Sequence, residues 1–253
     1  MKSIKILSSE DAVSEVVDFV TILGLLVLSI GIIGVAGYPI VKNAQEANHI
    51  ENTKQSFIVL ANNVNKVVIG QAPSQSVELK MYGGSLSVTG NSTINITANN
   101  SAGLRIPILN DTQMRSIESV VGETVIAYEG TGVWAKYPNG NTILVSKPLI
   151  TNQGNVLVIP VVTINGASSI GGSGVSRVTV KGVPSVTFYP NVNNITVTIN
   201  SSYWNGWNNY LQNVISLGSC TSSGSFGSCT VQLETTNNID IYILNIQLDT
   251  EVV

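Results

Sequence analysis

Hydrophobic positions along the chain follow two patterns that meet near residue 70. The first is an uninterrupted apolar run from Phe19 to Val41 that contains no charged residue. About 20 apolar residues in a helix are enough to cross the roughly 30 Å hydrocarbon layer of a membrane. The run therefore predicts a single membrane-spanning helix, with the span at residues 16–41.

The apolar pattern continues beyond this span at helical spacing. One stripe recurs at intervals of three, four and seven residues, and it consists of Ile50, Phe57, Leu60, Val64 and Val67 or Val68. Gly70 and Pro73 then end the pattern, and Pro39 is a position where a helix can kink. We predict one pilin-like helix over residues 13–69, with an amphipathic stalk at residues 43–69. The stripe needs a partner, either the chain's own head or a neighbouring subunit.

From Ser76 onward the pattern changes to short stretches of period two, separated by Gly, Asn and Pro. This period is typical of half-buried strands. The predicted strands are 76–81, 85–89, 93–98, 124–128, 132–137, 142–145, 156–164, 177–181, 186–189, 195–199, 229–233 and 240–247, and Gly171–Gly172–Ser173–Gly174 is predicted to be a hairpin loop. The fold class is α+β, with a β-rich, antiparallel, sandwich-like head at residues 76–253. Residues 1–12 form a leader or a cytoplasmic segment.

One segment of the head has helical rather than strand spacing. Trp204, Trp207, Leu211 and Val214 share a helical face, and Ser201 or Ser202 is placed to cap its start. Clustered aromatic residues can bind sugars, which makes Trp204, Trp207 and Tyr210 a candidate surface patch. Aromatic residues at helical spacing more often pack into a core, and this spacing favours core packing.

Composition narrows the classes of function. Only 11% of the 253 residues are charged and the net charge is -3, so we expect no nucleic-acid partner. His49 is the only histidine and the chain has two cysteines, which leaves little material for a zinc site or a triad built on imidazole. No nucleophile elbow, phosphate loop or paired carboxylates stand out. We expect no catalytic residues, no metal and no cofactor, and therefore no enzyme.

The composition of the head also suggests two covalent modifications. Cys220 and Cys229 enclose a Ser- and Gly-rich loop, and in an exported domain they are a candidate disulfide pair, with two free thiols as the alternative. Asn-x-Ser/Thr acceptor sequences occur at Asn91, Asn95, Asn99, Asn110, Asn194 and Asn200. The first four are candidate N-glycosylation sites because they lie in hydrophilic stretches. Asn194 and Asn200 flank a predicted strand and are less suitable.

The layout of the first 90 residues resembles type IV pilins and the pilin-like surface proteins of archaea. The resemblance rests on Ala12-Val13-Ser14-Glu15-Val16-Val17, on the apolar run, on Gly37-Tyr38-Pro39, on residues 43–68 and on Gly83-Gly84-Ser85-Leu86. It implies peptidase cleavage between Ala12 and Val13, and a role for Glu15 in subunit assembly. The residue before Ala12 is Asp11 rather than the basic residue of that family. Glu15 and Asp18 have a second interpretation as interfacial carboxylates at the inner end of the span.

These observations lead to one leading function and one alternative. The leading function is a membrane-anchored surface protein, structural or adhesive, that can act as a filament subunit. Its partners would be membrane lipid and further copies of itself or other pilin-like subunits. The alternative is a monomeric anchored module that binds a carbohydrate or a protein outside the cell. Lys2 and Lys5 before the span favour a cytoplasmic N-terminus, so the location is the cell membrane, single-pass with the head outside, or an extracellular filament.

Overall fold

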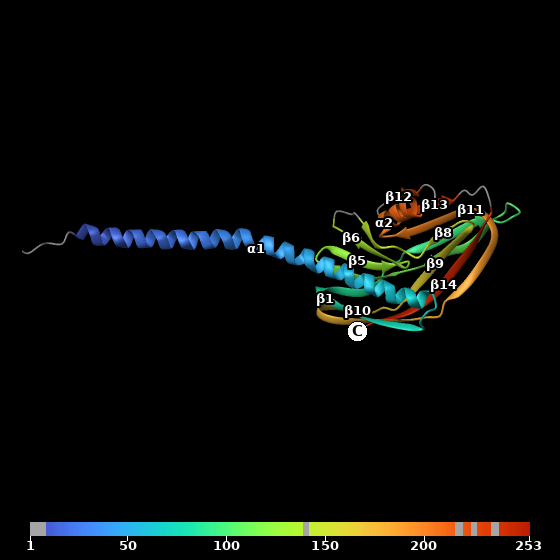
Figure 1. Cartoon of the computed structure of the whole chain (residues 1–253), viewed down its shortest axis with the longest axis horizontal. Helices are drawn as coiled ribbons and strands as arrows, with labels where there is room; N and C mark the ends of the chain where they lie inside the picture. The colour runs from blue at the N-terminus through green and yellow to red at the C-terminus, as the bar shows by residue number, and fades with distance from the viewer. Residues whose placement is uncertain (1–8, 139–141, 216–219, 224–226, 234–237) are drawn as a thin grey trace, which may run out of the picture. The chain divides into compact units, whose positions relative to one another are not determined.

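The computed structural model describes residues 9–138, 142–215, 220–223, 227–233 and 238–253 (Figure 1). For residues 9–15, for Val214 and for Cys220–Ser223 it describes the backbone alone. The chain divides into two compact units, Met1–Asn48 and His49–Val253. The boundary falls inside a helix rather than at its end.

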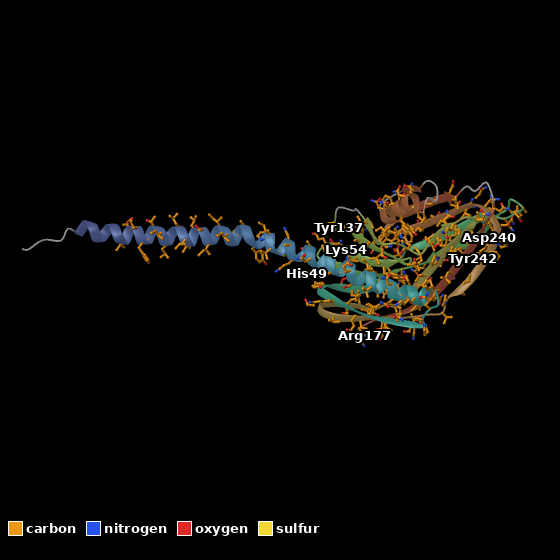
Figure 2. The ribbon with its side chains drawn as sticks, in the orientation of Figure 1. His49, Lys54, Tyr137, Arg177, Asp240 and Tyr242 are labelled. Carbon is orange, nitrogen blue, oxygen red and sulfur yellow. The ribbon has the colours of Figure 1, made fainter. Side chains whose placement is uncertain are left out.

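Helix α1 runs from Ser9 to Val68, which confirms the predicted long N-terminal helix to within a few residues. It continues through Pro39 without a break. In the first unit its large apolar side chains from Val16 to Val41 are each between 50% and 80% exposed, and side chains project from the helix on opposite sides (Figure 2). By length and composition this helix could cross a membrane once.

The second unit is built mainly from strands, as the period-two pattern predicted. Their bounds are β1 Ser74–Thr89, β2 Thr93–Asn99, β3 Arg105–Gln113, β4 Ser116–Val121, β5 Thr124–Glu129, β6 Gly132–Lys136, β7 Thr142–Ser146, β8 Thr151–Gln153, β9 Val156–Asn165, β10 Ser169–Lys181, β11 Ser185–Ser201, β12 Cys220–Ser223, β13 Gly227–Leu233 and β14 Ile239–Val252. Between β11 and β12 lie the short helix α2 (Trp204–Asn209) and a π-helical turn η1 (Tyr210–Val214).

Strand β11 belongs to both sheets of the head. Its first part, Ser185–Val192, pairs with β14 in a first sheet. This sheet also contains β1 and β4 to β10. Its second part, Asn193–Ser201, pairs with β2 and β13 in a second sheet that also contains β3 and β12. The pairing is antiparallel, as expected, with β9 and β14 forming a parallel pair.

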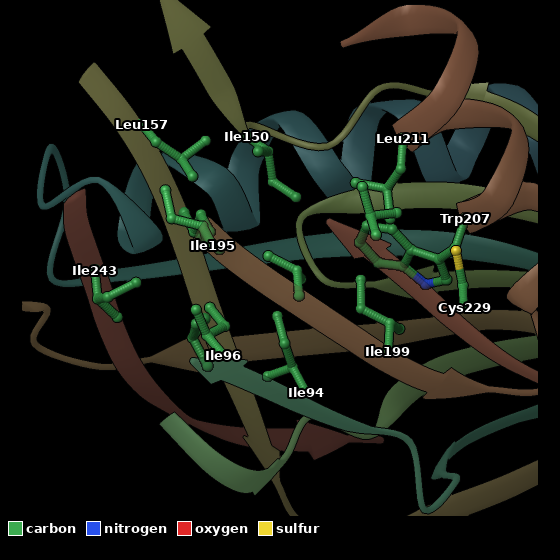
Figure 3. Packing of buried hydrophobic residues seen from close by; sticks show 14 of the residues in the cluster. Ile94, Ile96, Ile150, Leu157, Ile195, Ile199, Trp207, Leu211, Cys229 and Ile243 are labelled. Atoms are coloured by element: carbon green, nitrogen blue, oxygen red, sulfur yellow. The ribbon is translucent and has the colours of Figure 1, made fainter. Parts of the chain in front are cut away.

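Two hydrophobic cores lie on opposite faces of the first sheet, which gives the head three layers. Along β5, Ile126 and Tyr128 enter one core and Ala127 enters the other, as period two requires. The helix core forms between residues 57–68 of α1 and the first sheet. The inter-sheet core forms between the two sheets and α2, and Figure 3 shows Trp207, Leu211 and Cys229 grouped within it.

Some predicted boundaries were wrong. The segment Gly171–Gly174 is not a hairpin loop but part of β10, where it pairs with β1 around Gly84. Gly172 and Gly174 have φ values of 121° and 141°, which only glycine adopts without strain. A side chain at Gly84 would overlap the carbonyl oxygen of Val120. These glycines allow close strand approach, a role that the sequence pattern alone does not distinguish from a turn.

Candidate functional site

The exposed apolar part of α1 is chemically suited to a lipid environment. It carries few hydroxyl groups, and those of Thr21 and Ser29 donate to the carbonyl oxygens of Val17 and Leu25, at 2.8 Å and 2.7 Å. A hydroxyl group without a partner is costly in hydrocarbon, and bonding to the carbonyl four residues earlier removes that cost. This surface therefore presents apolar side chains together with satisfied polar groups.

The stalk stripe packs against the chain's own head. Phe57, Leu60, Val64, Val67 and Val68 are each at most 1% exposed and lie in the helix core. Ile50 is half-buried against the same cluster. Of the two partners that the sequence left open, the structure supplies the head, so this stripe is not a free surface for a neighbouring subunit.

A polar junction joins the helix to the turn between β5 and β6. The side chain of Asn65 donates from Nδ2 to the carbonyl oxygen of Thr131 at 3.0 Å, and its Oδ1 accepts from the hydroxyl of Tyr128 at 2.9 Å. Gly130 and Thr131 have positive φ values of 56° and 69°, and the amide of Leu149 donates to Thr131 Oγ1 at 2.9 Å. Hydrogen bonds from Asn65 and from Leu149 therefore hold the turn, and the bonds to Asn65 also hold helix α1 against the sheet.

Glu129, the residue before this turn, places a carboxylate inside the protein at 1% exposure. Its Oε1 accepts from Ser201 Oγ at 2.6 Å and from Trp207 Nε1 at 2.8 Å, and its Oε2 accepts from Ser92 Oγ at 2.5 Å. Burial raises the pKa of Glu129, and the hydrogen bonds from Ser201, Ser92 and Trp207 oppose that rise. The carboxylate thereby connects β5 to Ser92, the residue before β2, to β11 and to α2.

Sequence reasoning did not single out Glu129. The available signal is one acidic residue directly after the apolar strand Val125–Tyr128 and directly before Gly130-Thr131-Gly132. A surface carboxylate at the end of a strand has the same local sequence, because the donors Ser92 and Ser201 are distant in the chain. Only the fold brings them to Glu129.

The spacing of the aromatic residues favoured core packing, and the structure confirms it; the alternative, a surface patch at Trp204, Trp207 and Tyr210, is wrong. Trp207 and Tyr210 are 1% and 2% exposed. Trp207 packs against Trp134 with ring centroids 4.7 Å apart and against Tyr210 at 6.3 Å. Trp204 is half-buried, and β13 lies so close that a side chain at Gly227 would overlap its ring. The aromatic residues anchor α2 in the inter-sheet core and leave no shared face for a ligand.

The predicted serine cap of this helix was also wrong. The N-cap is Tyr203 and has no side-chain hydrogen bond to the helix. Ser201 Oγ instead accepts from the amide of Tyr203 at 2.9 Å and donates to Glu129. Ser201 therefore serves the buried carboxylate network rather than the helix terminus.

The candidate glycosylation asparagines lie on and beside β2 and β3. Asn91 and Asn110 are exposed, and Asn95 and Asn99 are half-buried. On β2 the side chains of Ile94, Ile96 and Ala98 enter the inter-sheet core, so Asn95, which lies between them, and Asn99, which follows them, face outward. Asn95 Nδ2 donates to Asn110 Oδ1 at 3.5 Å and to Asp111 Oδ1 at 3.4 Å. The fold brings two of the four sites together, and their glycosylation stays a prediction.

Other sequence-derived candidates lie where the description is limited to the backbone. Ala12, Val13 and Glu15 fall in the first turns of α1, and nothing is described of their side chains. Cys229 is buried in the inter-sheet core, and Cys220 begins β12 with its side chain outside the description. Cleavage, assembly and the disulfide therefore stay predictions. Among the described residues, no group of three or more His, Cys, Asp or Glu could hold a metal ion.

A shallow hollow of about 220 Å³ lies beside β4, β5 and β6. It is lined by Glu118, Glu123, Val125, Lys136, Tyr137, Pro138, Ser202 and Tyr203. Glu118 Oε1 accepts from Ser116 Oγ at 2.7 Å. The pKa of Tyr203 is raised, mainly because the phenol is buried and to a smaller extent because the Glu118 carboxylate is nearby. A neutral phenol between fixed carboxylates is a structural arrangement and is not an activated nucleophile.

A family model described as a family of unknown function (DUF7289) matches residues 12–249, and the chain therefore belongs to that family. No curated protein and no solved structure matches the chain.

Proposed function

We propose that this member of the DUF7289 family is a membrane-anchored surface protein that displays its β-rich head outside the cell in a structural or adhesive role. The observation that carries the proposal is the division of one helix into two surfaces. Its large apolar side chains at residues 16–41 are exposed, whereas its stripe at residues 57–68 is buried in the head. A soluble protein rarely exposes so large an apolar surface, and a bilayer covers it.

Assembly into a filament is the finer form of this proposal, and the resemblance to type IV pilins supports it. Since the stalk stripe is already occupied, subunits would contact one another through the helix surface at residues 16–41. The carboxylate of Glu15 would then be neutralised within the assembly, because a charge in an apolar bundle needs a partner. Processing between Ala12 and Val13 would expose a new amino terminus close to Glu15.

The location outside the cell also supports two covalent modifications of the head. An oxidising environment favours a bond between Cys220 and Cys229. Glycans on Asn91, Asn95, Asn99 and Asn110 require accessible side chains, and Asn91 and Asn110 have them. Peptide mass spectrometry without reduction would detect both modifications on protein purified from its native cells.

The proposal is tested by membrane fractionation combined with electron microscopy of sheared surface filaments and mass spectrometry of the N-terminus. The expected result is that the chain is found in filaments and starts at Val13. Glu15→Gln is then expected to abolish the filaments, whereas Glu46→Gln, a change further along the same helix, leaves them intact.

Recovery of the chain in the membrane fraction with residues 1–12 intact and without filaments would support the alternative, a monomeric anchored binding module. Recovery in the soluble fraction without a membrane or filament form would overturn both.

A further inference from the structure

The face of the first sheet that α1 covers continues beyond the end of the helix. On β14, Ile241 and Ile243 enter the inter-sheet core, whereas Ile246 and Leu248 lie in the helix core. Tyr242 and Leu244 alternate with the first pair and therefore face the helix side. Leu244 still packs at the edge of the helix core, but Tyr242 is beyond it and only partly buried.

This uncovered part of the sheet carries a strip of four side chains, one from each of four strands, of which two are aromatic. Phe188 on β11 pairs with Tyr242 on β14, Tyr242 pairs with Val158 on β9, and Val158 pairs with Thr151 on β8. The rings of Phe188 and Tyr242 stack with centroids 4.7 Å apart and an interplanar angle of 29°. Phe188 remains 47% exposed and Val186, two residues earlier on the same face, is 62% exposed. At about 4.8 Å between strands, the strip is roughly 14 Å long.

Polar side chains border the strip along its next row. Asp240 precedes Tyr242 on the same face of β14, and Figure 2 shows the two residues close together. Asp240 pairs with Val156, which pairs with Gln153. The amide of Asn191 donates to Asp240 Oδ1 at 3.0 Å, which holds the carboxylate in place. Within the described part of the chain, Asp240 Oδ2 and the hydroxyl of Tyr242 make no hydrogen bond, so both are available to a ligand.

We propose that the strip formed by Phe188, Tyr242, Val158 and Thr151 binds a neutral glycan chain. The C–H faces of sugar rings pack on the faces of aromatic rings, and their hydroxyl groups bond to side chains at the edge. The side chains that can bond to the sugar hydroxyls here are those of Asp240, through Oδ2, and of Tyr242, Thr151 and Gln153. The strip and its border contain a carboxylate and no Lys or Arg, which disfavours an acidic polymer.

A narrow strip suits an extended chain better than a protein partner. A stable protein interface buries about 800 Å² on each side around a broad apolar centre, whereas this surface is one row of four side chains, two of them aromatic, with a polar border. The inference rests on the proposed function only in placing the head outside the cell, where glycans are encountered.

Isothermal titration calorimetry on the full chain tests this inference. The protein is held in micelles of a zwitterionic detergent without a sugar headgroup, which avoids competition. The probes are the neutral hexasaccharides of β-linked glucose, N-acetylglucosamine and mannose, with hexagalacturonate as the acidic comparison. We expect at least one neutral probe to bind, hexagalacturonate not to bind, and the affinity to change little between 50 mM and 500 mM salt.

Two variants locate the binding. Phe188→Ala and Tyr242→Ala are each expected to weaken it at least tenfold. The matched control is Tyr82→Ala, since Tyr82 stacks on His49 at 4.3 Å in another part of the head, and it should leave the affinity unchanged. Thermal melting of each variant establishes that the fold is retained.

Failure of all three neutral probes to bind would overturn the inference, as would binding that survives both strip variants. Association of the chain with itself that Phe188→Ala disrupts, without glycan binding, would also overturn it by identifying a second copy as the occupant. None of these results depends on membrane fractionation or filament microscopy, so failure here is distinguishable from failure of the proposed anchor.

Discussion

At the scale of single residues, Glu129 is the charged side chain that the head buries most completely among its described residues. Moving an isolated carboxylate out of water is costly, and three hydrogen bonds from neutral donors offset part of that cost. The pKa of Glu129 is raised because burial outweighs those bonds. The residue therefore organises the core while making the fold sensitive to pH.

The sign of this pH dependence follows from linkage. A carboxyl group with a raised pKa in the folded state stabilises the fold fully below its unfolded pKa, near 4.5. That contribution is lost as pH rises through the folded pKa. We predict that the free energy of unfolding of wild type falls relative to Glu129→Gln as pH rises above about 4.5, because the amide does not titrate. Denaturant titrations across pH in the same detergent measure this difference.

A companion variant separates charge from hydrogen bonding. Glu129→Ala removes the acceptor for Ser92, Ser201 and Trp207 and leaves a cavity. Relative to Glu129→Gln, it is expected to lower the free energy of unfolding by about 3 kcal/mol at every pH, because neither variant titrates at this position. If the difference between wild type and Glu129→Gln were independent of pH, Glu129 would not titrate as its burial implies.

At the scale of elements, two valines on different faces of helix α1 contribute very differently to the stability of the head. Val64 is fully buried in the helix core, whereas Val59, five residues earlier, is 51% exposed. Replacing a buried valine by alanine removes two methyl groups. The fold then loses the free energy gained by transferring them out of water, and a cavity remains. We predict that Val64→Ala lowers the free energy of unfolding by about 2 kcal/mol and that Val59→Ala changes it by less than about 0.5 kcal/mol.

Chemical denaturation followed by tryptophan fluorescence is a suitable measurement, because Trp134 and Trp207 are buried in the head. Equal effects of the two alanine variants would contradict the docking of the stalk stripe. The result would then favour a helix whose stripe is free for a neighbouring subunit.

How far the sequence predicts these elements depends on whether their signal is local. The stripe from Ile50 to Val68 and the alternation of Ile195, Val197 and Ile199 depend on neighbours a few residues away, and both predictions are confirmed. Strands β3, β4, β8 and β12 were not predicted. They are short or, like β3, are rich in polar residues and contain a residue with positive φ, Asp111, so their alternation is weak.

Other features depend on tertiary contacts that no local pattern contains. The parallel pairing of β9 with β14 joins segments about 80 residues apart. The donors to Glu129 come from the residue before β2, from β11 and from α2. Trp204 and Trp207 have the spacing of a packing face and the chemistry of a binding patch, and only their burial decides between the two. Phe188 and Tyr242 lie in strands that were predicted, but their stacking requires the register between β11 and β14.

At the scale of the whole molecule, the proposed function depends on which side of the membrane carries the head, and an exposed loop of the head allows a direct test. The segment from Asn100 to Leu104 is a turn between β2 and β3, and Leu104 is 65% exposed. Exposed loop tips are preferred sites of proteolysis. Chymotrypsin added to intact native cells is therefore expected to cleave after Leu104 and to shorten a C-terminally tagged chain.

The matched control is Leu104→Asp, which removes the cleavage site from a position where the side chain has few contacts to lose. Cells that carry this variant should keep the full-length chain under conditions that cleave wild type, because the strands on either side protect their backbone by pairing. If wild type is cleaved only after the membrane is permeabilised, the head lies inside the cell. An adhesive or filament role would then fail, and the glycan proposal would lose its premise, although the membrane anchor itself would stand.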